Sequence, residues 1–167
     1  NLDALSNLES VGGEFKLYLN SDLTDLSALA QLTSVGGKLL INQNGSLENL
    51  VGLSSLTTLG AGLYVGYNGA LLNFDGLESL SSVGFIFVGV NNSLKSIDAL
   101  GSLQSVGDYL LIKNNSSLEQ LNGLSQIKTV GHYLQVSDNE SLTDISGLSS
   151  LETVNSELTI ENNGALC

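Results

Sequence analysis

A leucine recurs along the whole chain at a nearly fixed interval, and this repeat constrains the fold more than any other feature of the sequence. The recurring leucines are separated by 24, 24, 23, 24, 24 and 24 positions. The short interval follows Val83, where VGF stands in place of the VGG of other units. With a partial unit from Leu2 to Asp22, the array comprises about seven units, whose leucines are Leu23, Leu47, Leu71, Leu94, Leu118, Leu142 and Leu166.

Each unit carries two kinds of apolar spacing. In the unit that begins at Leu23, Leu39 and Ile41 alternate with polar or variable neighbours, which predicts a short strand. The apolar residues before them recur every third position from Leu23 to Val35, which fits neither a strand nor a long amphipathic helix. This spacing predicts a turn-rich return path of 3₁₀ turns or short strand pieces, with a glycine such as Gly36 at the corner.

No single unit can bury its own apolar side, but stacked units cover one another. We therefore predict a β-rich solenoid of about seven stacked 24-residue, leucine-rich turns that form a parallel β-sheet. One asparagine also recurs in each turn. An inward amide at a corner can pair with backbone groups that would otherwise be buried without partners. We expect the whole column to point inward: Asn20, Asn44, Asn68, Asn91, Asn115, Asn139 and Asn163.

Composition excludes several classes of function. Five lysines, no arginine and 17 acids give a net charge of −12, which disfavours binding to nucleic acid or to anionic lipid. The single cysteine, Cys167, and the single histidine, His132, leave no cysteine or histidine metal site and no nucleophilic constellation. We expect no enzyme activity, no cofactor, no metal site and no membrane insertion by this segment.

The units follow the pattern LxSVGGxLxIxxNxSLxxLxGL, and QSVGDYLLIKNNSSL and KTVGHYLQVSDNESL are two examples. This pattern resembles receptor L domains, the leucine-rich β-solenoids of insulin- and epidermal-growth-factor-type receptors. Similar repeats are found in fungal cell-wall and bacterial surface proteins. The resemblance covers the whole chain and implies an extracellular or cell-surface location. Those receptor domains carry disulfides and caps, which this chain lacks, so we expect residues 1–167 to be a single repeat domain within something longer or capped by a partner.

The outward side chains of the predicted strands are rich in aromatic residues. The face carries four acids and three lysines, which leaves 13 acids and two lysines for the rest of the chain. Aromatic enrichment with few charges is the composition of an interface core, although aromatic residues also suit strands and stack for stability. The candidate partner-binding residues are Tyr18, Leu40, Tyr64, Tyr67, Phe85, Phe87, Tyr109, Leu111 and Tyr133.

These observations favour a non-catalytic extracellular recognition module that binds a protein or glycan partner through its strand face. The alternative is a structural surface protein, a spacer or a protomer that self-assembles. A column of hydroxyl residues, which includes Ser34, Thr58 and Ser82, is expected to make local turn hydrogen bonds, although a regular hydroxyl array also suits contact with ice or glycan.

Overall fold

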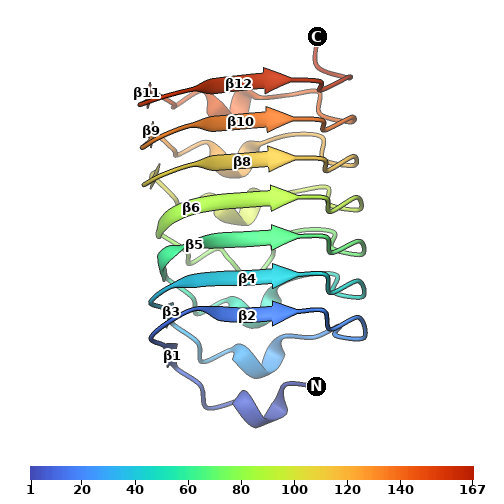
Figure 1. Ribbon diagram of the computed structural model, residues 1–167, viewed down its shortest axis with the longest axis vertical. Helices are drawn as coiled ribbons and strands as arrows, with labels where there is room; N and C mark the ends of the chain where they lie inside the picture. Colours follow the sequence, from blue (N-terminus) through green and yellow to red (C-terminus); the bar gives the residue numbers. More distant parts are fainter.

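The chain winds into a β-solenoid in its computed structural model, which describes residues 1–167 (Figure 1). Stacked parallel strands form about six turns with a spacing of roughly 24 residues, which confirms the predicted fold class. The count is close to the predicted seven, because the first and last units are incomplete.

One long strand from each turn builds the main sheet. In-register parallel pairing aligns Leu40 with Tyr64, Tyr64 with Phe87, and Phe87 with Leu111. Where the short repeat interval falls, Gly60 and Ala61 of one strand lie opposite Gly84 alone, so the missing residue produces a bulge. The long strands are β2 (Phe15–Tyr18), β4 (Lys38–Asn42), β5 (Thr58–Gly66), β6 (Ser82–Gly89), β8 (Leu110–Lys113), β10 (Leu134–Ser137) and β12 (Leu158–Glu161).

The return path of most turns combines a 3₁₀ turn with a short strand, as the threefold apolar spacing predicts; the path between β5 and β6 has no 3₁₀ turn, and in these two strands the short piece is continuous with the long one. The 3₁₀ turns are η1 (Asp3–Leu5), η2 (Ser27–Leu29), η3 (Val51–Leu53), η4 (Asp98–Leu100), η5 (Asn122–Leu124) and η6 (Ser146–Leu148). The short strands are β1 (Ser10–Val11), β3 (Ser34–Val35), β7 (Ser105–Val106), β9 (Thr129–Val130) and β11 (Thr153–Val154). None of the helical segments is long and apolar enough to cross a bilayer.

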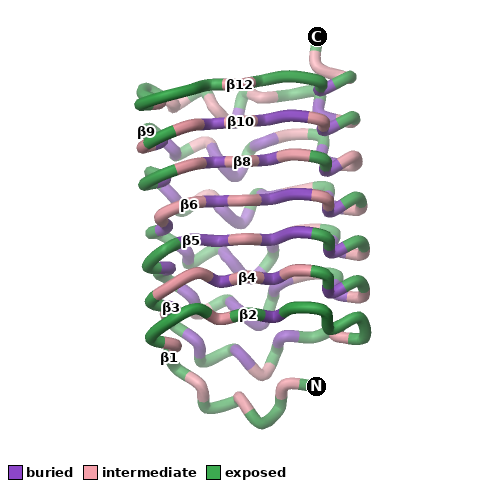
Figure 2. The backbone as a smooth tube through the Cα atoms, in the orientation of Figure 1, coloured by how far each residue is buried: buried purple, intermediate pink, exposed green.

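The core is a single apolar column that runs the length of the stack (Figure 2). It contains 37 buried hydrophobic residues, most of them fully enclosed. The inward positions match the predicted columns: Leu53 and Phe74 have no exposed surface, and Phe15 packs against the cluster from the first turn. The residues at the ends of the stack, such as Leu158 and Ile160, are exposed.

The asparagine column is buried and forms a hydrogen-bonded ladder, as predicted. The Asn91 side chain donates from Nδ2 to the carbonyl of Val65 at 3.1 Å, and its backbone N–H donates to Oδ1 of Asn115 at 3.1 Å. The same pattern links Asn44 to Asn68 and continues to Asn163. Asn20, in the first turn, is the exception because its side chain is exposed.

A left-handed residue precedes every ladder asparagine. These residues have φ between 55° and 59°, and their side chains include Leu19 and Val90, which disfavour this conformation. The conformation persists because the backbone N–H still joins the sheet: that of Val90 donates to the Lys113 carbonyl at 3.2 Å. The strand therefore bends sharply and turns the next side chain inward without losing its inter-turn bond.

The hydroxyl column differs from the expectation. The hydroxyls of Ser34, Thr58 and Ser82 make no hydrogen bond within the chain, because β3, β5 and β6 point them outward. The preceding residues make the inter-turn bonds instead: Thr33 Oγ1 donates to the Glu9 carbonyl at 3.0 Å and Thr57 Oγ1 to the Thr33 carbonyl at 3.1 Å.

Candidate functional site

The outward side chains of the long strands form one continuous surface, here called the strand face. At its centre lie five half-buried rings, here called the aromatic cluster: Tyr64, Phe85, Phe87, Tyr109 and Tyr133. In-register pairing places the side chains of successive turns directly above one another, so the rings stack along the solenoid axis.

The cluster consists of two stacks. Tyr64 and Phe87 form the first, with centroids 4.2 Å apart and planes inclined by 9°. The second runs from Phe85 to Tyr109 at 4.8 Å and on to Tyr133 at 5.3 Å. Such spacings are typical of favourable offset stacking. The rings are therefore held in fixed positions before any partner arrives.

Glycines lie beneath the rings and let them rest flat on the sheet. A Cβ at Gly62 would meet Phe85 Cδ1 at 2.5 Å, and one at Gly89 would meet Phe87 Cζ at 2.6 Å. Both glycines are buried although they belong to the outward side of their strands. The rings thus have a structural role as well: they cover backbone that would otherwise face water.

The other predicted site residues surround this cluster. Leu40 and Leu111 are half-buried on β4 and β8, and they continue the column that contains Tyr64 and Phe87. Tyr18 and Tyr67 are each 50% exposed and join neither ring stack. The structure therefore brings seven of the nine predicted residues into one patch and leaves these two at its margin.

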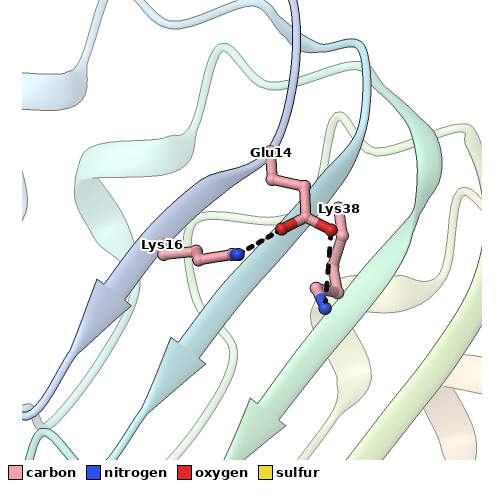
Figure 3. A network of polar contacts seen from close by, with 3 residues as sticks. All are labelled: Glu14, Lys16 and Lys38. Carbon is pink, nitrogen blue, oxygen red and sulfur yellow. Dashed lines mark ion pairs between the residues drawn. The ribbon is translucent and has the colours of Figure 1, made fainter.

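Charge on the strand face is concentrated at its two ends, but one lysine lies near the centre: Nζ of Lys113 on β8 is 5.6 Å from the centroid of the Phe87 ring. At the β2 end, the carboxylate of Glu14, which directly precedes β2, pairs with Lys16 of β2 and with Lys38 of β4 at 3.7 Å (Figure 3). The hydrogen bond from Lys16 lowers the pKa of the Glu14 carboxyl below its usual value. In the centre, burial raises the pKa of Tyr64 and of Tyr109 above 10.0, so both phenols stay neutral at ordinary pH.

A hollow of about 330 Å³ opens at the β12 end of the strand face. One ring, that of Tyr133, borders it, together with two exposed carboxylates, Glu157 and Glu161. Sequence reasoning placed these acids on the face but missed the hollow. The signal in the sequence was Glu157, an acid at the repeat position that Tyr109 and Tyr133 occupy in the two preceding turns.

No protein-family model matches the chain, and no curated protein matches it either. The class that the structure defines is a parallel β-solenoid with an aromatic strand face. The choice of function therefore depends on the geometry of that face.

Proposed function

We propose that the chain is a non-catalytic recognition module that binds a protein or glycan partner through the strand face. The observation that carries the proposal is the aromatic cluster, a preorganised patch of rings with a single lysine, Lys113, beside them. Interfaces concentrate their binding energy in a few central aromatic residues, and rigid side chains lose little entropy on binding.

Two further features support this function. The rest of the surface is strongly acidic, so the cluster is the apolar exception on a chain of net charge −12. The resemblance of the repeats to receptor L domains points in the same direction, toward a module at the cell surface that recognises its partner on the strands.

The test is a glycan array combined with protein capture, performed with the wild-type chain and two variants. Leu111→Glu places a charge beside Phe87 in the middle of the patch, whereas Thr129→Glu places one on the exposed side of β9. We expect Leu111→Glu to abolish the binding that the wild type shows and Thr129→Glu to retain it. Binding that survives Leu111→Glu in a folded protein would refute the proposal.

Solution mass at low concentration separates this proposal from a structural role. A recognition module is monomeric until its ligand is added. A stable oligomer that Leu111→Glu dissociates would instead show that the strand face joins copies of the chain, as a self-assembling surface protein requires.

A further inference from the structure

The stack of Phe85, Tyr109 and Tyr133 is closed at one end and open at the other. Phe85 rests on Gly62, and each following ring rests on the one before it. The residue of the next turn in register with Tyr133 is Glu157, which brings no ring to stack on Tyr133. The His132 ring also contacts Tyr133, but edge-on, with the centroids 5.2 Å apart, and it does not line the hollow. The hollow lies at this place and has room for one more flat group.

Two carboxylates border this hollow, and neither has a basic partner in the chain. The ion pairs of the whole molecule involve only Glu14 and Asp108 as acids. Glu157 Oε1 accepts from Thr159 Oγ1 at 3.0 Å, and Glu161 Oε1 accepts from Gln135 Nε2 at 3.3 Å. These bonds orient the carboxylates and leave the second oxygen of each without a donor.

A ring with one open face beside two carboxylates that lack a basic partner is complementary to a planar cation. A guanidinium group stacks on aromatic faces, is weakly hydrated and donates paired hydrogen bonds to carboxylates. A lysine ammonium is neither planar nor bidentate, and a neutral sugar leaves the charge of both acids uncompensated. We infer that the hollow is a subsite for an arginine side chain presented by a protein partner, an inference that rests on the proposed function of the strand face.

The test is a titration of the ¹⁵N-labelled chain with N-acetylarginine amide, followed by NMR. Its neutral isostere N-acetylcitrulline amide, the lysine analogue and a methyl glucoside are titrated in parallel. We expect arginine to shift the amides of Tyr133, Gln135 and Thr159, with the citrulline and lysine compounds binding at least about tenfold more weakly. Salt at about 0.5 M should weaken the arginine shifts, because the carboxylates are exposed.

Three variants test whether arginine binds in this hollow. Glu157→Gln and Tyr133→Leu are expected to weaken arginine binding at least about tenfold, since each removes one wall of the subsite. Glu152→Gln removes an exposed acid elsewhere in the same turn and serves as the matched control, with binding unchanged. Should Tyr133→Leu fail to fold, Glu157→Gln alone decides, because its side chain is exposed and nearly the same size.

Equal shifts with arginine and citrulline would overturn the inference, because charge would then play no part. Shifts at Tyr133 with the glucoside and none with arginine would overturn it too and make the hollow a sugar subsite. Either result leaves the proposed function standing if Leu111→Glu still abolishes partner binding. The proposed function is refuted only if Leu111→Glu leaves partner binding intact. A failure of the arginine subsite and a failure of the proposed function therefore give different results.

Discussion

At the scale of single residues, the corner of every turn after the first depends on a left-handed residue followed by a buried asparagine. The asparagine could be predicted from sequence, because its recurrence at a corner has few explanations other than pairing with buried backbone groups. The left-handed residue could not. Residues such as Val90 and Leu19 disfavour positive φ, and only the stacked neighbours, which hold the backbone in register, impose it.

Replacing Asn91 by alanine removes one rung of the ladder. The Val65 carbonyl loses its donor and the Asn68 backbone N–H loses its acceptor, Asn91 Oδ1, so buried polar groups are left unpaired. We expect the free energy of unfolding to fall by about 1–3 kcal/mol in urea denaturation. The matched control is Asn92→Ala, an exposed neighbour whose replacement should have little effect. Equal stability of Asn91→Ala and the wild type would contradict the ladder.

Replacing Val90 by asparagine relieves strain at φ 58°. A β-branched residue is costly in the left-handed region, which asparagine tolerates. We expect a gain of about 1 kcal/mol, seen as a higher urea midpoint with an unchanged slope. Val90→Ala should gain less, because alanine lacks the branch yet still disfavours positive φ. A lower midpoint for Val90→Asn would show that the Val90 side chain stabilises the fold by packing.

At the scale of elements, the sequence predicts which residues form the strand face, but only part of how their side chains are arranged. The alternation along each strand identifies which residues point outward, and the fixed repeat length aligns them between turns. The seating of Phe85 over Gly62 depends on cross-strand geometry that no pattern within one strand reveals. The hollow beside Tyr133 could not be predicted for the same reason, because it arises where a stack of rings ends and not from any local motif.

The half-buried phenols of Tyr64 and Tyr109 predict a pH dependence of stability. Burial raises the pKa of Tyr64 and Tyr109 above 10.0, so the folded state holds these protons more tightly than the unfolded chain does. This contribution is fully present below about pH 10 and is lost as the pH rises through the folded pKa values. The double variant Tyr64→Phe/Tyr109→Phe should lose less stability than the wild type between about pH 10 and 11. Parallel pH profiles in urea denaturation would contradict this prediction.

At the scale of the whole molecule, the fold is nearly one-dimensional, because each turn contacts mainly its two neighbours. A single apolar column joins all turns, which is why the sequence repeat alone predicts the architecture. A defect in a middle turn should therefore divide the stack, whereas the same change on its surface should not.

Leu53→Asp tests this continuity. Leu53 has no exposed surface, so the substitution buries an unpaired charge in the middle of the core and should cost at least about 3 kcal/mol. Val51→Asp is the matched control on the same 3₁₀ turn. Val51 is 56% exposed, and its replacement should change stability by less than about 0.5 kcal/mol. Similar urea midpoints for the two variants would show that the inward register is wrong.

We propose that the partner binds on the strand face, and side-chain oxidation by hydroxyl radicals tests whether it does. Oxidation is measured with and without the partner that the capture or array experiment identifies. We predict that the partner lowers oxidation of Phe87, Tyr109 and Tyr133, while the exposed Val51 and Leu72, outside the strand face, react as before. Protection of Val51 and Leu72 with unchanged oxidation of the aromatic cluster would contradict the account.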